Sequence, residues 1–365
     1  MKKLFSIIIC ALLCAAAAMP AWAAAAGEDV NTIILRYYRD GVDVGAAGFL
    51  EDFEEAAREG SPEAMFLIAA IYDQGMGVPV DYQKAAEWYR RAADAGNEVS
   101  MYCLGSMFLW GEGLEQSDEQ AILWFRKAAE AGYGPAMTDL GRMYESGLGV
   151  PASNEAALEW YQKAAEAGDA KGMNELGAVY RYGKGVPRDD VKAAEWYLKA
   201  AEAGSVDAMN DLAVMYWSGL GVEKDPEQAM AWFRKAAEAG NADAMHNVGA
   251  IILMQGGDID EAVKWIAAAA DAGRKDSMIT LGKLYLGQSG YLPRDDGKAI
   301  MWFEKAADAG DPEGMYLLGL LLYTGQEDEQ ERAIALWWQA AGMGYEDAAE
   351  VLQYALGSDW EETGK

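Results

Sequence analysis

Residues 137–172 read MTDLGRMYESGLGVPASNEAALEWYQKAAEAGDAKG, and this phrase of 36 residues recurs along most of the chain. Each copy is anchored by a tryptophan, at Trp88, Trp124, Trp160, Trp196, Trp232, Trp265 and Trp302, with Leu336 in the eighth place. Similarity at a fixed period of this length is typical of stacked helical arrays, in which each repeat is one supersecondary unit. The chain is therefore expected to fold as a row of like units.

The first half of the phrase predicts a helix, which we call helix A. A methionine, an aliphatic residue, a small residue and an aromatic residue stand at i, i+3, i+4 and i+7, as at Met137, Leu140, Gly141 and Tyr144. Side chains at these spacings share one face of an α-helix. Gly-x-Gly follows in five copies, beginning at Gly75, Gly111, Gly147, Gly183 and Gly219. Glycine there permits the left-handed turn that ends a helix and reverses the chain.

The second half predicts another helix, helix B, which runs through Ala-x-x-Trp-Tyr/Phe-x-x-Ala-Ala to a terminal glycine. Residues suited to cap its first turn are Asp81, Ser117, Ser153, Asp189, Asp225, Asp258 and Asp295. The paired alanines let neighbouring backbones approach closely, and the tryptophan is expected to supply the large buried surface. One unit is thus a helical hairpin whose apolar face needs its neighbours.

The combined phrase, Ala-Met-x-x-Leu-Gly-x-x-Tyr-x-x-Gly-x-Gly-Val and then Ala-x-x-Trp-Tyr-x-Lys-Ala-Ala-Glu-x-Gly, resembles the Sel-one-like repeat (SLR) family, relatives of the tetratricopeptide repeats (TPR). The resemblance implies an all-α fold, a right-handed superhelical solenoid of about eight helix-turn-helix SLR/TPR-like repeats. The late copies depart from the phrase, at residues 255–258 in the sixth, at residues 288–293 in the seventh and at Leu336 in the eighth. We expect the curvature and the binding surface to change there.

The two ends of the chain are predicted to differ from the array. Residues 1–23 have two lysines, a short apolar stretch and an Ala-Trp-Ala end, which predicts a secretory signal peptide; an uncleaved membrane anchor is the alternative. Residues 24–60 are expected to hold an N-terminal segment and a capping half-repeat, residues 61–344 eight repeats, and residues 345–365 a C-terminal capping helix and tail. The predicted location is periplasmic, or secreted, with no stable membrane insertion.

The charge and the cysteine content limit the partners further. A formal net charge of −29 makes nucleic acid and anionic lipid surfaces poor partners, so no nucleic-acid binding is expected. Solubility is one explanation of this charge, and a basic protein or peptide partner is the other. Beyond the predicted signal, Cys103 is the only cysteine, so no disulfide forms within the chain and a packing role is expected.

Catalysis is not expected. His246 is the only histidine, which excludes multi-histidine metal sites and leaves one possible triad base. The Gly-x-Gly turns follow helices rather than strands, unlike phosphate-binding loops. Asp258, Asp260 and Glu261 could contact a calcium ion, but a helix cap followed by first-turn acids explains them more simply. We therefore predict no catalytic residue, no metal site and no cofactor, with a carbohydrate-active or hydrolytic enzyme as the less favoured alternative.

Function is expected where the repeats differ, because the repeated positions serve packing. The resemblance implies that helix A lines the inner surface of the solenoid, at positions just after the methionine, the small residue and the aromatic residue. In the middle of the array this surface is predicted to carry Arg142, Asn174, Arg181, Tyr182, Asn210, Trp217 and His246.

These side chains suit a groove for a partner protein or peptide. Asparagine pairs with peptide groups, arginine holds carboxylates and tryptophan is an apolar anchor, and Arg142, Arg181 and Trp217 are expected to contribute most. The alternative is ordinary polar cover, with Trp110 and Trp217 tucked between repeats.

The resemblance also implies a function class: a non-enzymatic scaffold or regulator of protein complexes in the bacterial cell envelope. We expect a monomer that binds a protein or peptide partner. A secreted factor that meets host proteins, as some bacterial members do, is the alternative.

Overall fold

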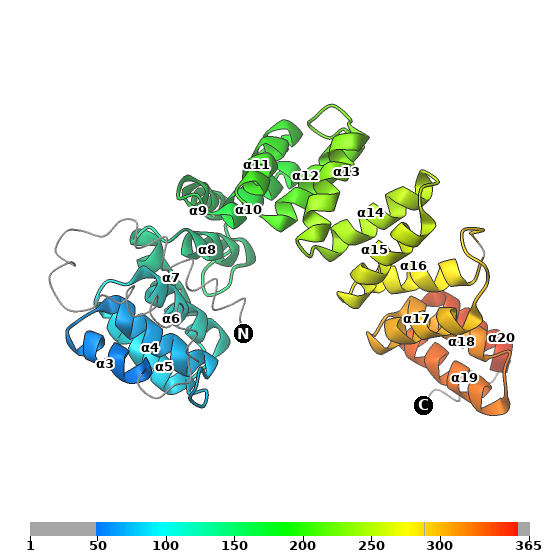
Figure 1. The fold of residues 1–365 in the computed structure, drawn as a ribbon, viewed down its shortest axis with the longest axis horizontal. Coiled ribbons are helices and arrows are strands. Elements are labelled where there is room, and N and C mark those ends of the chain that lie inside the picture. The colour runs from blue at the N-terminus through cyan, green and yellow to red at the C-terminus, as the bar shows by residue number, and fades with distance from the viewer. Residues whose placement is uncertain (1–48, 288, 357–365) are drawn as a thin grey trace. The chain divides into compact units, whose positions relative to one another are not determined.

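The structure is a computed structural model that describes residues 49–287 and 289–356 (Figure 1). All regular secondary structure in these two stretches is helical, in eighteen helices labelled α3 to α20. The predicted all-α fold is therefore confirmed.

Sixteen of these helices alternate as helix A and helix B of eight successive repeats. The A helices are α4 (Pro62–Gln74), α6 (Glu98–Trp110), α8 (Gly134–Ser146), α10 (Ala170–Tyr182), α12 (Val206–Ser218), α14 (Ala242–Met254), α16 (Lys275–Tyr285) and α18 (Pro312–Leu322). The B helices are α5 (Tyr82–Asp94), α7 (Asp118–Glu130), α9 (Asn154–Glu166), α11 (Asp190–Glu202), α13 (Pro226–Glu238), α15 (Ile259–Asp271), α17 (Asp296–Asp308) and α19 (Glu327–Gly342). α3 (Phe49–Arg58) precedes the hairpins and α20 (Glu346–Leu356) follows them.

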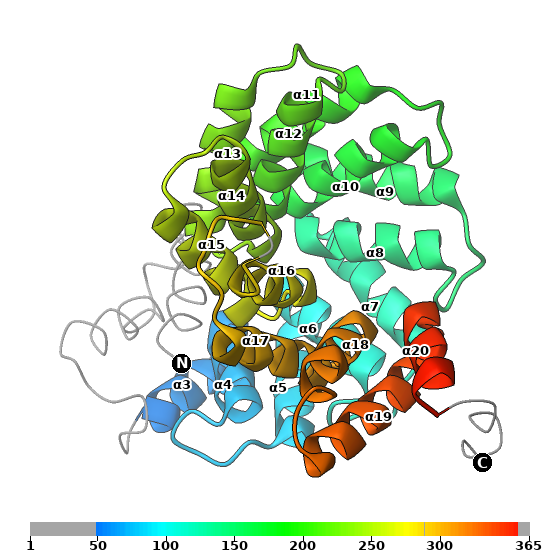
Figure 2. The ribbon, with the colours of Figure 1, turned by 90° about the vertical axis from the view of Figure 1, so that its right-hand side faces the viewer.

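The chain divides into two compact units, Met1–Trp196 and Tyr197–Lys365. In the first unit each helix from α3 to α10 packs against the next, and α8 also packs against α10. In the second unit the same succession runs from α12 to α20 (Figure 2). Each unit therefore buries its core between successive hairpins, as a solenoid does.

The ends of the helices lie where the sequence predicts them. All seven expected caps of helix B accept a backbone N–H of the first turn, as Asp225 does from Gln228 at 2.9 Å. Gly113, the second glycine of its loop, has a φ of 68°, and a Cβ there would lie 2.4 Å from the backbone carbonyl carbon of Tyr82. This glycine is therefore required by the turn and also by the close approach of the preceding repeat.

A second set of caps, at helix A, was not predicted. The residue after each terminal glycine caps the following helix A where it is Ser, Asn or Asp, as Asp169 does for Gly172. Two repeats have Tyr133 and Arg274 at this position, and neither side chain makes a capping hydrogen bond. These repeats begin helix A without the stabilisation that a cap provides.

The most deeply buried aromatic residue of helix B is the one after the anchor tryptophan. Phe125 and Tyr161 are 0 % exposed and Trp337 is 1 % exposed. A Cβ added at Gly141 of helix A would lie 2.4 Å from the Tyr161 ring, so the small residue of helix A gives this ring its place. Our expectation that the anchor tryptophan supplies the large buried surface was incomplete, because its neighbour fills the core of the hairpin.

The anchor tryptophan packs between neighbouring repeats. Trp124 belongs to the apolar cluster of the preceding repeat, and its outer face is covered by Lys127, whose Nζ lies 3.8 Å from the ring centroid. The same cover lies over Trp88, Trp160, Trp232 and Trp302, at 4.0 to 4.5 Å. A cation over the face of an indole is an attractive contact. Trp124 thus joins neighbouring hairpins, with a lysine over one face of its buried ring.

Several expectations concern the chain ends. The predicted signal, residues 1–23, and residues 24–48 lie outside the described residues, so the signal stays a prediction. Within the part of the chain that is described, no helix combines the length and apolar character needed to cross a bilayer.

Cys103 is half-buried in α6, and burial raises the pKa of its thiol to about 12. This thiol is therefore protonated at neutral pH, consistent with packing.

Candidate functional site

The seven predicted surface residues lie on four A helices and in both units. The first unit holds Arg142 on α8, with Asn174, Arg181 and Tyr182 on α10. The second unit holds Asn210 and Trp217 on α12, with His246 on α14. The residues thus form two sets, one in each unit.

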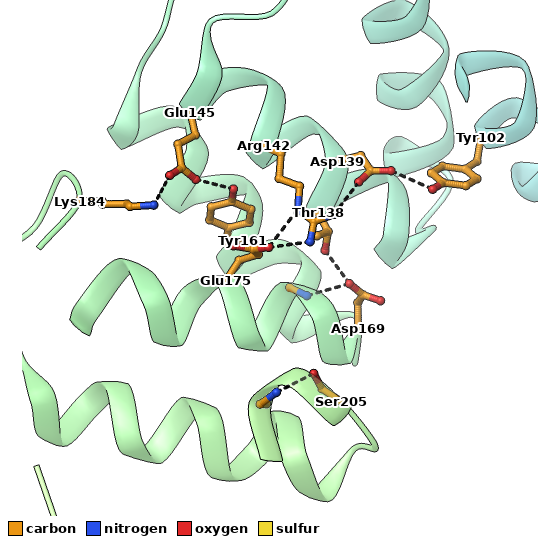
Figure 3. A network of polar contacts seen from close by, with 12 residues as sticks. Tyr102, Thr138, Asp139, Arg142, Glu145, Tyr161, Asp169, Glu175, Lys184 and Ser205 are labelled. Carbon is orange, nitrogen blue, oxygen red and sulfur yellow. Dashed lines mark hydrogen bonds and ion pairs between the residues drawn. The ribbon is translucent and has the colours of Figure 1, made fainter. Parts of the chain in front are cut away.

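Arg142 is held by two carboxylates (Figure 3). Its Nε and Nη2 donate to Glu175 Oε1 of α10 at 3.0 and 2.6 Å, and its Nη1 donates to Asp139 Oδ1 at 3.4 Å. Burial opposes the charged form, but the bonds to Glu175 together with the negative charges of Glu175 and Asp139 outweigh this effect and raise the pKa of Arg142. Its side chain is still 48 % exposed. Arg142 therefore ties α8 to α10 and keeps part of its guanidinium at the surface.

The position after the methionine also links neighbouring repeats. Tyr102 on α6 donates its hydroxyl to Asp139 Oδ2 on α8 at 2.8 Å, and Thr138 donates to Asp169 Oδ2 at 2.5 Å (Figure 3). Asp169 also caps α10 through Gly172, so one carboxylate joins a helix end to the previous repeat. Side chains at this position are therefore part of the contact between repeats.

A second polar cluster lies at the ends of the same helices. Glu145 at the end of α8 accepts the Tyr161 hydroxyl at 2.8 Å and forms an ion pair with Lys184, from the loop after α10 (Figure 3). Burial alone would raise the pKa of Glu145, but the bonds from Lys184 and Tyr161 lower it. The Lys184 loop is thereby fixed to the preceding repeat.

The rest of the first set divides between packing and exposure. Asn174 is half-buried, and its Oδ1 is enclosed without a hydrogen-bond partner. Tyr182 is 63 % exposed, with the Arg181 Cζ 5.4 Å and the Lys184 Nζ 6.0 Å from its ring centroid. The last turn of α10 therefore presents an aromatic ring beside two cations.

The second set is more enclosed. Asn210 accepts from Asn247 Nδ2 at 3.3 Å, and Trp217 is half-buried against the core of its unit. His246 Nδ1 lies 2.8 Å from the Ser277 hydroxyl, which is fully buried. Burial lowers the pKa of His246, and the charge of Asp276 only partly opposes this. A His–Ser pair with a fully buried hydroxyl cannot attack a substrate in this conformation.

Sequence reasoning missed the acidic partners of this surface. Asp139, Glu175 and Asp211 stand two residues after the helix A methionine in three successive repeats. The first two accept from Tyr102 and Arg142, so this column of carboxylates pairs with the positions that were predicted to bind a partner. The sequence shows these acidic residues at a fixed position of the repeat, but we interpreted the acidic residues only through the net charge and helix capping.

The exposure of Trp110 was also missed. This residue ends α6 and is 71 % exposed, so it is not tucked between repeats. Trp217 does pack, as that alternative required. Among the described residues no group of three or more histidine, cysteine or acidic side chains is placed to hold a metal ion.

Comparisons with known proteins agree with this architecture. The Sel1 repeat family model matches eight segments, residues 62–97, 99–133, 134–169, 170–205, 206–241, 242–273, 275–311 and 312–345. The chain belongs to the Sel1 repeat family. Proteins of this family generally mediate protein–protein interactions. No curated protein matches the chain.

Two solved structures have similar sequences as well as folds. The chain is 32 % identical to c5321, a protective antigen present in uropathogenic Escherichia coli strains that displays an SLR fold, with a TM-score of 0.63 over 92 % of this chain and 73 % of that one. It is 31 % identical to a Sel1 repeat protein from Oxalobacter formigenes, with a TM-score of 0.56 over 75 % of this chain and 98 % of that one.

Proposed function

We propose that this protein is a non-enzymatic scaffold or regulator of the bacterial cell envelope that binds a partner protein or peptide on its A helices. The family supports protein binding in general. The envelope location is inferred from the predicted signal in residues 1–23, and the protein is proposed to act as a periplasmic or secreted monomer without a cofactor.

The observation that supports this function most strongly is that Arg142 is held in place by its neighbours and still has hydrogen-bond donors left over. Its guanidinium has five N–H donors, and the bonds to Glu175 and Asp139 use three of them. Two donors stay without a protein partner among the described residues, on a side chain that is 48 % exposed. An arginine fixed in place by its neighbours, with donors remaining, is pre-organised to bind a carboxylate or a peptide carbonyl.

The first unit also offers an exposed aromatic neighbour. Asn174 contributes less, because its amide oxygen is enclosed and closed to an incoming peptide. Tyr182, at the end of the same helix, adds exposed apolar surface.

The experiment is affinity capture from native envelope and culture-medium fractions, with the two units tested separately. One variant combines Arg142→Ala with Arg181→Ala, and a second carries Trp217→Ala alone. The matched control is Lys283→Ala, which removes an exposed pair with Glu313 at 2.6 Å between two later repeats.

A partner kept by the control and lost by either variant, with circular dichroism unchanged, supports the proposal and assigns the partner to that unit. Each variant is expected to bind the partner more weakly by about 2 kcal/mol or more, because it removes an arginine or an apolar anchor. Equal capture by all four proteins would overturn binding on the A helices.

A second function has one observation in its favour. The similar chain c5321 is described as a protective antigen of uropathogenic strains, and it shares 32 % identity with this protein. This favours the alternative that the protein is a secreted factor that meets host proteins. Recovery of the mature chain, beginning after residue 23, in culture medium rather than in the periplasm would support secretion.

A further inference from the structure

Trp110 is an exposed aromatic residue that the core does not explain. It is the last residue of α6, and its exposure of 71 % contrasts with the 7 % of Trp124 in the following helix. Tryptophan gives large apolar area to water in this position, and such residues are enriched where partners bind. The question is which chemistry covers its ring.

The molecule contains an internal comparison for this position. Trp110 corresponds to Tyr182, two repeats later, which is also exposed. In that later repeat Arg181 and Lys184 lie 5.4 and 6.0 Å from the tyrosine ring. The chain itself therefore supplies cations to the aromatic residue at this place of the repeat.

The repeat of Trp110 lacks these cations. Leu109 stands where the later repeat has Arg181, and Glu112 stands where it has Lys184. Glu115 adds a second acid in the same loop, and both glutamates are exposed. Within residues 49–287 and 289–356, no Lys or Arg lies over the Trp110 ring, although five anchor tryptophans have such cover.

The surroundings extend this surface toward the first repeat. The loop after α6 lies against the start of α5, because a Cβ at Gly113 would be 2.4 Å from the backbone of Tyr82. Tyr82 is itself 40 % exposed. We define the Trp110 surface as Trp110, Glu112, Glu115 and Tyr82: two exposed aromatic residues with two exposed carboxylates.

We propose that the Trp110 surface binds an arginine- or lysine-bearing segment of a basic partner protein, with one cation over the indole and the neighbouring carboxylates completing its neutralisation. The inference rests on the proposed protein-binding function and names the charge of the partner. A second copy of the chain is disfavoured as the occupant, because each copy carries a net charge of −29. The cation–indole contact supplies the specificity that acidic residues alone lack.

The test uses the chain beginning at residue 24, with 5-fluorotryptophan incorporated and the Trp110 resonance assigned by its loss in Trp110→Leu. The probe is a short peptide with two adjacent arginines between glycines, and its control replaces both arginines by neutral citrulline. The arginine peptide is expected to shift the Trp110 resonance, whereas the citrulline peptide leaves it in place.

Affinities follow from the anisotropy of a dye-labelled arginine peptide. Trp110→Leu is expected to weaken binding roughly 3-fold, the effect of one exposed cation–π contact. Glu112→Lys, which installs the lysine of the later repeat, is expected to weaken it roughly 10-fold, because the chain's own cation then covers the ring and a carboxylate is lost. Tyr354→Leu, at a ring on α20 that is 92 % exposed and lies outside both proposed surfaces, is expected to have no effect. Circular dichroism verifies that each variant is folded.

Three results would overturn the inference. They are equal affinity of the arginine peptide for the parent, Trp110→Leu and Glu112→Lys; no binding of the arginine peptide; and an equal shift of the Trp110 resonance by the citrulline peptide. These outcomes are separate from the capture experiment, since a partner lost on Arg142→Ala with Arg181→Ala establishes the scaffold whatever Trp110 does. If no partner is captured but the arginine peptide still binds at Trp110, the Trp110 surface remains as the binding site.

Discussion

Gly319→Ala is expected to destabilise the last repeat by closing the space that the Trp337 indole occupies. Trp337 is 1 % exposed and donates its Nε1–H to the Tyr316 carbonyl at 3.1 Å. A Cβ at Gly319 would lie 2.3 Å from that Nε1 and 2.8 Å from two ring carbons. These separations are far below van der Waals contact, so the ring or α18 must shift.

The magnitude follows from three terms. Over-packing a core of this kind costs about 1–3 kcal/mol, and loss of the indole hydrogen bond costs about 0.5–1.5 kcal/mol. Alanine is the better helix former and returns about 1 kcal/mol. The free energy of unfolding of the last repeat should therefore fall by about 0.5–3.5 kcal/mol.

Two variants show whether the indole is the cause. Ala213 and Phe233 occupy the corresponding positions of an earlier repeat, and both are buried there. Adding Trp337→Phe to Gly319→Ala recreates that pair and should recover part of the loss. Gly342→Ala, where nothing lies within 4 Å of the new Cβ, serves as the control and should be neutral or slightly stabilising.

The assay is urea unfolding followed by far-UV circular dichroism, with hydrogen exchange of α18 to α20 to localise the effect. Because terminal repeats open separately from the rest, the exchange of these helices should accelerate most. Unchanged exchange in Gly319→Ala, or a double variant less stable than the single one, would refute the packing argument.

Two further predictions concern contacts between repeats. Asp169→Ala removes the cap of α10 and the acceptor of the buried Thr138 hydroxyl, so the first unit should lose about 2–4 kcal/mol in urea unfolding. Asn97→Ala, which removes the cap of α6, should cost about 1 kcal/mol, and equal losses would contradict a role for Thr138. Burial lowers the folded-state pKa of His246 below the ordinary value of 6.5, so the stability that the neutral histidine contributes is present above pH 6.5 and is lost as pH falls below it. Between about pH 7.5 and pH 5.5 the parent should therefore lose more stability than His246→Gln. Equal losses would show that the histidine is not linked to folding.

Local features of the fold were predictable because they depend on neighbours in the chain. Asp225 and its six counterparts cap helix B as expected, since a cap is decided within three residues. Glycines such as Gly113 mark the left-handed turns for the same reason. The different positions of Trp124 and Phe125 could not be predicted in the same way. Both are large aromatic residues, and only the direction of each ring decides which one fills the core of the hairpin.

The candidate surface shows the limit of this reasoning. The choice of Arg142 came from its position in the repeat, and its ties to Glu175 and Asp139 came from the structure. Whether the seven chosen residues bind a partner stays a prediction. Trp110 was placed between repeats in one alternative, and the structure puts it in water.

The sequence by itself determined the family, the helical hairpin and its period, because repetition averages out local ambiguity and each turn, cap and apolar stripe is encoded within one repeat. Tertiary structure alone decided which polar groups pair across repeats, which aromatic ring fills each hairpin and which stays in water. Those outcomes depend on side-chain directions and distances between residues about one repeat apart, as between Arg142 and Glu175, and spacing along the chain does not specify them.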